Sequence, residues 1–292
     1  MKNGICVGSD HWENTKTLMY MEAEVENVRE KTAEKLPGSW YPGQRLHQGT
    51  MSETWLMHSE GVSWRLVLKL AANEKSAWAL RREIDILRRL RGEGIPFLYH
   101  YDMAGGSPDY EMTDVMPWYT MPFYDGETLR ERLDRRHTLT ERETVQTGRR
   151  LCKILDVLHH RGRPIIYGDL KPENVLLTPD GSVYLLDYGN AWYQGEEQGH
   201  IGFRGTPGYA APECWHLERA GVSVDIFALG VMLHEMLEGG QPREHFGDYS
   251  LTDGAYKKRW QALINASTAL NAEKRIRDVR EADRQLRNIT LT

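Results

Sequence analysis

The chain has 292 residues, 40% of them hydrophobic and 27% charged, and its 42 acidic and 37 basic residues give a net charge of -5. These proportions exclude global disorder, and the length predicts one to two domains. A mildly acidic chain is a poor candidate for a general nucleic-acid or membrane-surface binder.

The cysteines and the apolar runs indicate the cellular compartment in which the protein is expected. The cysteines Cys6, Cys152 and Cys214 lie far apart with no CxxC pair, so neither a disulfide framework nor a zinc cluster is indicated. This usage fits a reducing cytosol, and the N-terminal MKNGICVGSDHWEN has no signal-peptide core. The longest apolar run, 226–233, contains Gly230 and is too short to cross a bilayer. We expect a cytoplasmic protein without membrane association.

Residues 1–39 are expected to form an N-terminal extension. Within it, apolar residues at helical spacing predict an amphipathic helix over residues 17–36, with Val28 on the apolar side. Pro37-Gly38 ends the pattern. The favoured interpretation is a helix packed on the following domain, and the alternative is a helix that contacts a partner or a second copy of the chain.

The next part of the chain, to about residue 123, predicts short strands around one strong helix. The strands are expected at residues 54–57, 64–70 and 119–123. The helix is expected over Glu74–Leu90, because apolar residues recur on one face, and Gly92-Glu93-Gly94 then breaks the pattern.

After residue 126 the chain is predicted to be mainly helical. The expected helices cover residues 128–136, 141–161, 224–238, 256–270 and 277–288. The apolar runs Val175–Leu177 and Val183–Leu186 are joined by Thr-Pro-Asp-Gly, which predicts a hairpin because Pro and Gly favour the turn dihedrals. A small strand-rich lobe thus precedes a larger helical lobe, an arrangement that favours a ligand site between lobes.

Three ordered strings carry the chemistry of the chain. They are Tyr167-Gly-Asp-Leu-Lys-Pro-Glu-Asn174, Asp187-Tyr-Gly189 and Gly205-Thr-Pro-Gly-Tyr-Ala-Ala-Pro-Glu213. Asp, Asn and Gly are common in turns, so one such string could simply be a turn, but turns do not explain three strings in this order. Together they resemble the eukaryotic-type (serine/threonine) protein kinase family, over roughly residues 40–290. The resemblance implies an α+β bilobal fold, with a small antiparallel-sheet N-lobe (about 40–121) and a larger, mainly helical C-lobe (about 125–290).

The resemblance assigns the reacting groups. Asp169 takes the position of the catalytic base, and Lys171 the position that reaches the γ-phosphate of ATP. Asn174 and Asp187 take the positions of the Mg²⁺ ligands, with Mn²⁺ as an alternative metal, because a hard cation prefers oxygen ligands. The implied protein substrate is not identified by the sequence.

The phosphate-binding lysine of the family corresponds to Lys69, at the end of an apolar strand. Its implied partner is a glutamate on the following helix. Glu83 is favoured over Glu74 because Leu87 then falls where the family's regulatory spine needs an apolar residue.

The glycine-rich loop departs from the family pattern. In the segment from His47 to Thr54 only the central Gly49 remains, and His47 and Ser52 replace the flanking glycines. Glycine allows the backbone to approach phosphate closely. The departure therefore concerns nucleotide affinity rather than the fold.

The resemblance also assigns residues 121–126 as the hinge beside the nucleotide base. Met121 takes the gatekeeper position, and the Pro122 carbonyl and the Tyr124 N–H take those that bond adenine. Thr128 is the candidate for the ribose. The residues expected to sandwich the base are Thr54, Val67 and Leu176.

Four further positions complete the resemblance. Asp225 is expected to accept hydrogen bonds from the catalytic loop, since a buried charge needs such partners. Arg275 is expected to pair with Glu213. Thr206 takes the place of the threonine that bonds the catalytic Asp and Lys, on the shelf that receives the peptide.

The position before the catalytic aspartate is Gly168, where many kinases have an arginine that receives a phosphate of the activation loop. The loop offers Tyr193, Thr206 and Tyr209 as phosphate acceptors. We predict that this loop becomes competent without phosphorylation. The cations that could replace the missing arginine are Lys153, Arg161 and Arg204.

The favoured function is an ATP- and Mg²⁺-dependent protein kinase specific for serine and threonine. A pseudokinase that acts as a nucleotide-binding or scaffold module is the alternative, and the altered glycine loop favours it. A small-molecule phosphotransferase of related fold is a further alternative, which the Ala-Pro-Glu segment disfavours.

Overall fold

The computed structural model describes residue 28 and residues 40–103, 116–196, 203–215, 220–242, 247–252 and 254–289. It contains two compact units, the first made of Met1–Ile84 and Leu98–Phe123 and the second of Asp85–Phe97 and Tyr124–Thr292. Within the described ranges, no helix is long and apolar enough to cross a membrane. The helix expected over residues 17–36 lies outside them, apart from Val28, which is helical.

The first unit contains a five-stranded antiparallel sheet of order β1-β2-β3-β5-β4. Its strands are β1 (Trp40–Gln48), β2 (Ser52–Ser59), β3 (Leu66–Ala71), β4 (His100–Asp102) and β5 (Trp118–Pro122). The three strands predicted in this region are confirmed as β2, β3 and β5. Strand β1 was not predicted because Pro, Gly and polar residues interrupt its apolar pattern, and β4 is too short to give one.

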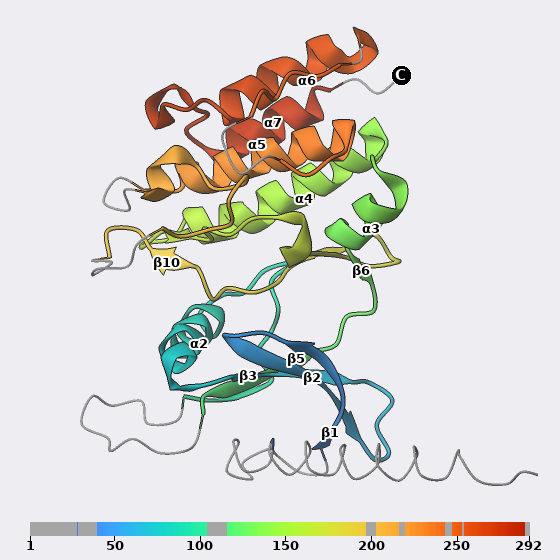
Figure 1. The fold of residues 1–292 in the computed structure, drawn as a ribbon, viewed down its shortest axis with the longest axis vertical. Helices are drawn as coiled ribbons and strands as arrows, with labels where there is room; N and C mark the ends of the chain where they lie inside the picture. Colours follow the sequence, from blue (N-terminus) through green and yellow to red (C-terminus); the bar gives the residue numbers. More distant parts are fainter. Residues whose placement is uncertain are drawn as a thin grey trace, which may run out of the picture. The chain divides into compact units, whose positions relative to one another are not determined.

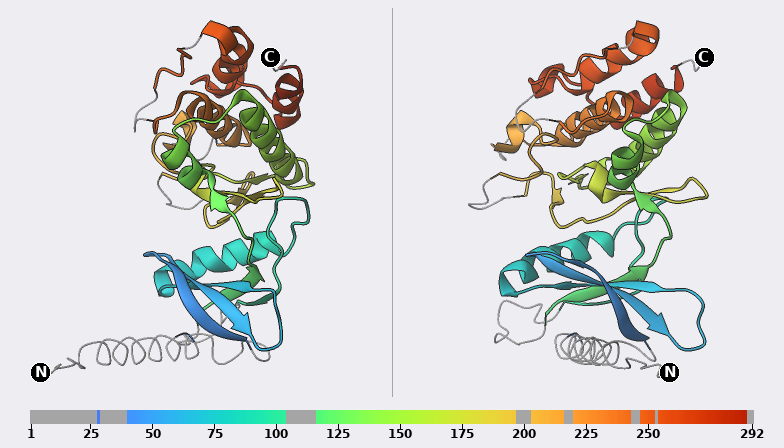
Figure 2. Two further views of the ribbon diagram at one scale, coloured as in Figure 1. Left: turned by 90° about the vertical axis from the view of Figure 1, so that its right-hand side faces the viewer. Right: turned by 45° about the vertical axis from the view of Figure 1, so that its right-hand side comes forward.

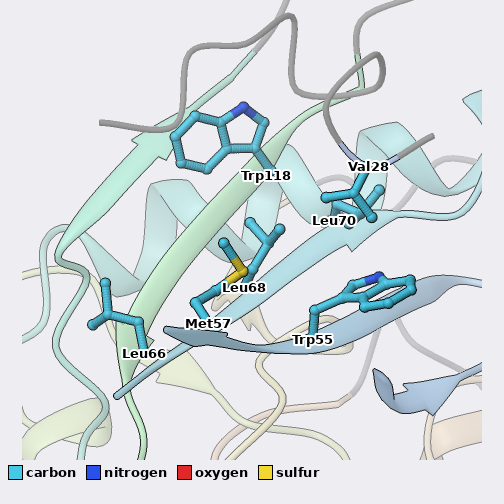
Figure 3. Packing of buried hydrophobic residues seen from close by; sticks show 7 residues of the cluster. All are labelled: Val28, Trp55, Met57, Leu66, Leu68, Leu70 and Trp118. Carbon is cyan, nitrogen blue, oxygen red and sulfur yellow. The ribbon is translucent and has the colours of Figure 1, made fainter. Parts of the chain in front are cut away.

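One face of this sheet is apolar. Successive side chains of a strand point to opposite faces, so Leu66, Leu68 and Leu70 of β3 share this face. The buried cluster that it forms consists of Val28, Trp55, Met57, Leu66, Leu68, Leu70 and Trp118. Figure 3 shows Val28 with the other side chains of this cluster. Because Val28 is only 1% exposed, this residue of the predicted apolar stripe does pack on the domain that follows.

Helix α2 (Glu74–Leu87) follows β3 and runs beside the sheet (Figures 1 and 2). Its start is fixed by Asn73, which accepts a hydrogen bond from the Ser76 N–H at 3.1 Å, while the Ser76 hydroxyl accepts one from the Asn73 N–H. The helix ends at Leu87, before the predicted Leu90, because Arg89 and Leu90 donate to carbonyls three residues back and tighten the chain into a turn.

The helices of the second unit match the predictions closely. They are α3 (Leu129–Arg136), α4 (Glu141–His159), α5 (Ser223–Glu238), α6 (Gly254–Ser267) and α7 (Val279–Arg287). Thr128 and Thr140 open α3 and α4 with capping boxes. Helix α5 is buried on nearly all sides, with α4 and α6 packed against it and α7 against α4 (Figure 2).

Short strands in the second unit flank residues 167–174, the segment that the resemblance identifies as the catalytic loop. They are β6 (Glu127–Thr128), β7 (Ile165–Ile166), β8 (Val175–Leu177), β9 (Val183–Leu185) and β10 (Trp192–Tyr193). The predicted hairpin is confirmed as β8–β9, with Gly181 at a φ of 80° and its N–H bonded to the Thr178 carbonyl. Asn174 precedes β8 and Asp187 follows β9, so the antiparallel pairing of Val175 with Leu185 places both at one end of the hairpin.

Candidate active site

Lys69 and Glu83 form a buried ion pair within the first unit. The Lys69 ammonium donates to both carboxylate oxygens of Glu83, at 3.0 and 2.9 Å, and the two residues are 9% and 1% exposed. A buried charge is costly unless it is paired and hydrogen-bonded, which each residue achieves through the other. The pairing predicted between β3 and α2 is thus confirmed, while Glu74 lies on the exposed first turn of the helix.

Tyr119 completes this pair, and the sequence alone did not single it out. Its hydroxyl donates to Glu83 Oε1 at 3.0 Å. Tyr119 of β5 lies directly opposite Lys69 of β3, and opposed residues of neighbouring strands share a face of the sheet. The register of β5 would have revealed this contact, but the register is not readable from the local pattern.

The β1–β2 loop is tight and anchored. The Gly49 N–H donates to the Ser52 carbonyl at 2.9 Å. At the tip, the Thr50 carbonyl accepts a hydrogen bond from the Asn73 side chain at 3.0 Å, and the Met51 carbonyl accepts one from the Ala72 N–H at 3.2 Å. Bonds to the segment after β3 therefore fix a loop that lacks the flanking glycines of the family pattern.

The residues predicted to contact the base lie in both units. In the first unit, Val67 pairs with Met121 across β3 and β5, Pro122 pairs with Leu66, and Thr54 pairs with Lys69. These pairings place Val67 and Met121 beside each other. The contacts of these residues with adenine stay predictions.

In the second unit, Thr128 pairs with Leu176 across β6 and β8. The Tyr124 ring stacks on Tyr184 with centroids 3.8 Å apart. The Thr128 hydroxyl accepts from the Glu131 N–H at 3.1 Å and donates to the Glu131 carboxylate at 3.0 Å. Capping α3 is therefore a structural role of Thr128, and its contact with ribose stays a prediction.

A three-residue cluster lies at the catalytic loop. The Thr206 hydroxyl donates to Asp169 Oδ1 at 2.6 Å and accepts from the Lys171 ammonium at 2.8 Å. The Lys171 ammonium is 3.2 Å from Asp169 Oδ2. The structure thus brings together the predicted base, the predicted phosphate-binding lysine and the threonine expected to bond both.

Asn190 is a further neighbour of Asp169 that the sequence did not indicate. Its side-chain amide donates to Asp169 Oδ2 at 3.2 Å. The residue directly follows Asp187-Tyr-Gly. Its position next to this motif was the only feature of the sequence that could have indicated a role for it.

Asn174 and Asp187 offer oxygen atoms suited to a hard cation. The Asn174 amide nitrogen donates to the Asp169 carbonyl at 2.9 Å, so its side-chain oxygen is the atom left to face a cation. Asp187 is exposed and has a φ of 55°, a left-handed conformation that non-glycine residues rarely adopt and that clusters at functional sites. One amide oxygen and one carboxylate fit Mg²⁺, which keeps much of its shell for phosphate and water.

Asp225 anchors the catalytic loop from the first turn of α5. Its carboxylate accepts hydrogen bonds from the Tyr167 and Gly168 N–H groups, each at 2.8 Å. The His159 Nε2 lies 2.9 Å from the same carboxylate, which is 1% exposed. The prediction that loop N–H groups compensate this buried charge is confirmed.

The predicted pairing of Arg275 with Glu213 is also confirmed. The guanidinium donates to both carboxylate oxygens, at 2.6 and 3.1 Å. It also donates to the Ser223 and Ala269 carbonyls. A bidentate ion pair of this kind is among the stronger polar contacts, and it fixes the end of the Ala-Pro-Glu segment on the helical unit.

Tyr209 belongs to a second polar cluster of this unit. Its hydroxyl donates to Glu235 at 2.6 Å and accepts from Arg130 at 2.7 Å. Burial, followed by the neighbouring Glu235 carboxylate, raises the pKa of Tyr209, and burial raises that of Glu235. Arg130 also donates to Glu173 at 2.9 Å, so the cluster joins α3, the catalytic loop and α5.

Comparison with known proteins agrees with this geometry. The Protein kinase domain family model matches residues 42–287. The chain is 41% identical over 150 residues (49% of it) to the rabbit (Oryctolagus cuniculus) Protein kinase C zeta type, and 30% identical over 223 residues (76%) to the Serine/threonine-protein kinase TIO of Arabidopsis thaliana. It is 35% identical over 188 residues (63%) to a Probable cAMP-dependent protein kinase catalytic subunit of Encephalitozoon cuniculi.

The matched segments cover 25%, 15% and 52% of the lengths of these three relatives. The family match, by contrast, extends over most of the present chain and includes the Lys69–Glu83 pair as well as the Asp169 cluster. The expected α+β kinase fold is confirmed, and the chain belongs to the protein kinase family.

Proposed function

We propose that the chain transfers the γ-phosphate of ATP to serine and threonine hydroxyls of protein substrates. The observation that carries this proposal is the cluster of Asp169, Lys171 and Thr206, with the oxygen-bearing Asn174 and Asp187 at one end of the β8–β9 hairpin. A phosphoryl-transfer site needs a proton acceptor, a cation for the phosphate and oxygen ligands for a metal. The second unit carries all three.

In the proposed reaction, Asp169 orients the substrate hydroxyl and accepts its proton. The hydroxyl oxygen forms a bond to the γ-phosphorus, the bond from that phosphorus to the bridging oxygen breaks, and ADP leaves. Lys171 neutralises charge on the transferring group. Asn174 and Asp187 would hold Mg²⁺, which when bound offsets the negative charge of the phosphates.

The first unit is assigned the α- and β-phosphates through Lys69. Its ammonium is oriented by both oxygens of Glu83, and Tyr119 donates to the same carboxylate. A lysine fixed in this way loses less side-chain freedom when it binds phosphate than a solvated lysine does, which supports its assignment to the nucleotide.

Serine/threonine specificity rests on two features. Lys171 two residues after the proposed base and Thr206 before the Ala-Pro-Glu segment are serine/threonine-type features in the family that the chain resembles. The Arabidopsis relative is itself named a serine/threonine-protein kinase.

The pseudokinase alternative is favoured by the β1–β2 loop, where His47 and Ser52 stand in place of glycines. Under that alternative the chain binds nucleotide without transferring phosphate. The retained Lys69, Asp169 and Asp187 favour activity, because a module without catalytic activity does not need all three residues.

The experiment is an assay of the purified full chain with γ-labelled ATP, Mg²⁺ and dephosphorylated casein, followed by phosphoamino-acid analysis. The parent should label serine and threonine. The labelling by Asp169→Asn should fall to the level of a reaction without enzyme, since an amide cannot accept the proton. The control Asp134→Asn changes a side chain that is 63% exposed and should label as the parent does. A parent that binds nucleotide in a titration but transfers no phosphate would establish the pseudokinase alternative.

A further inference from the structure

Gly168, at the position of the family's arginine, lies against the edge of a tryptophan ring. Its φ is 76°, and a Cβ built on it would come within 2.1 Å of Trp192 Cζ3. Trp192 belongs to β10, pairs with Ile166 of β7 and is 1% exposed. The indole therefore occupies the space through which any side chain of residue 168 would have to pass, so both the conformation and the space require glycine.

A buried arginine lies over the face of the indole. The Arg204 guanidinium carbon lies 5.4 Å from the centroid of the Trp192 ring, and Arg204 is 6% exposed. An arginine over an indole is attracted by the ring's quadrupole, and the attraction is stronger where water is excluded. Trp192 thus contacts Gly168 at its edge and Arg204 at its face. This group of three residues is named here the Gly168 stack, and it connects the catalytic loop to two parts of the activation segment (residues 189–210).

The stack reaches Asp169 by a second route. Arg204 donates from Nη1 to the Asn190 carbonyl at 3.1 Å, and the Asn190 side chain donates to Asp169 Oδ2 at 3.2 Å. Fixing the Asn190 backbone limits the directions in which its amide can point. Arg204 and Trp192 therefore act on the orientation of Asp169 through Asn190 and Gly168.

We propose that Trp192 and Arg204 are positioning residues that order the activation segment around Asp169 permanently, in place of a phosphate received by an arginine. The proposal deepens and rests on the proposed kinase function. The cation is supplied by the segment itself, as Arg204, and two of its contacts are an indole face and a backbone carbonyl. Neither contact depends on a modification of the chain.

The tyrosines of the segment are engaged in a way that agrees with this proposal. The Tyr193 hydroxyl donates to Asp85 Oδ2 at 3.3 Å, and Arg163 lies 4.7 Å from the centre of its ring. Tyr209 is 6% exposed and bonded to Glu235 and Arg130. A phosphate on either hydroxyl would have to displace these contacts before it could order anything else.

The test compares Trp192→Ala with Trp192→Phe in the full chain after phosphatase treatment. Trp78→Ala is the matched control, because Arg82 lies 5.3 Å from the centre of its ring but Trp78 is 54% exposed. Initial rates with ATP·Mg²⁺ and casein give kcat and KM, and hydrogen–deuterium exchange reports on residues 187–196.

We expect Trp192→Ala to lower kcat roughly 10- to 100-fold, the size typical of a small misplacement of a catalytic group. The KM for ATP should change little, because the Lys69–Glu83–Tyr119 contacts lie within the first unit and do not involve Trp192. Trp192→Phe keeps an aromatic face for Arg204 and should recover much of the rate. Exchange in residues 187–196 should be faster in Trp192→Ala than in Trp192→Phe, and Trp78→Ala should match the parent in every measurement.

Two results would overturn the proposal: a Trp192→Ala variant with parental kcat and parental exchange, or rates that fall equally in the Ala and Phe variants. If Trp192→Ala does not fold, Arg204→Gln replaces it, with Arg204→Lys as its conservative partner and the same expectations. If the parent itself transfers no phosphate, the proposed function fails, and the exchange comparison alone then decides whether the stack orders the segment.

Discussion

The two aspartates assigned to catalysis have different surroundings, which suit different roles. Asp169 accepts hydrogen bonds from Thr206 and Asn190 and is 8% exposed. Asp187 is exposed and held in a left-handed conformation, with its Oδ1 accepting from the Gly189 N–H at 3.2 Å. A fixed, largely buried carboxylate suits proton transfer at a defined atom, whereas an exposed carboxylate can join the shell of a hydrated cation.

Asp187→Asn should abolish nearly all phosphoryl transfer, because a neutral amide binds Mg²⁺ poorly and leaves the phosphate charge uncompensated. The measurement is the initial rate of label transfer from ATP, with circular dichroism as the check on folding. Asp180→Asn is the control, since Asp180 lies in the turn at the opposite end of the same hairpin. A folded Asp187→Asn variant with the parental rate would rule out this residue as a metal ligand.

Tyr119→Phe removes one donor from the buried Glu83 carboxylate. Leaving such a group short of a partner costs about 1–3 kcal/mol, so the melting temperature should fall and the KM for ATP should rise several-fold as Lys69 becomes less fixed. Tyr101→Phe is the matched control, because Tyr101 is the partner of Tyr119 in β4 but is 45% exposed. If the two variants had equal KM values for ATP, Tyr119 would have no part in positioning Lys69.

Among the structural elements, the β1–β2 loop lacks the flanking glycines of the family but is held by hydrogen bonds to Ala72 and Asn73. Replacing His47 and Ser52 by glycine should tighten ATP binding modestly or leave it unchanged, because the added glycines also make the unbound loop more flexible. A nucleotide titration measures this. Tenfold weaker binding in the double variant would mean that His47 or Ser52 itself contacts the ligand.

Val28 is buried in the cluster on the apolar face of the five-stranded sheet. Val28→Asp places a charge in the cluster shown in Figure 3 and should destabilise the chain by about 2–5 kcal/mol, through lost burial and an unpaired carboxylate. Thermal unfolding measures the effect. Val62→Asp makes the same change at a residue 37% exposed and should cost far less. Equal melting temperatures for the two variants would show that residue 28 does not stabilise the sheet.

The sequence predicted the elements that carry a strong local pattern and missed those that depend on distant pairing. Helix α5 and the β8–β9 hairpin were predicted within a residue or so, because burial and turn residues mark them. Strands β7 and β10 were missed, since two residues carry no periodicity and only their mutual pairing defines them. The Gly168 stack depends on β10, so it too was not readable from the sequence.

On the scale of the whole molecule, each unit stabilises its own charged cluster by internal bonds. Lys69, Glu83 and Tyr119 bond one another within the first unit. Asp169 and its neighbours do so within the second. The resemblance to the kinase family identified the charged members of both clusters. Tyr119 and Asn190 lie outside the family motifs, and only their contacts in the folded chain identified them.

We propose that the activation segment of this protein kinase needs no phosphate. Gly168 cannot receive one, and Thr206 is already bonded to Asp169 and Lys171. Arg204, one of the cations considered as a replacement receiver, is buried over Trp192. Under the proposal above, the described parts of the segment are held by these contacts without a phosphate.

The most direct test is the initial rate of phosphoryl transfer by the full chain after phosphatase treatment, with mass spectrometry to verify that residues 189–210 are unmodified. The treated chain should keep the rate of the untreated chain, because the Gly168 stack is unaffected by the phosphatase. A hundredfold fall in rate, restored by rephosphorylation of a residue between 189 and 210, would contradict it.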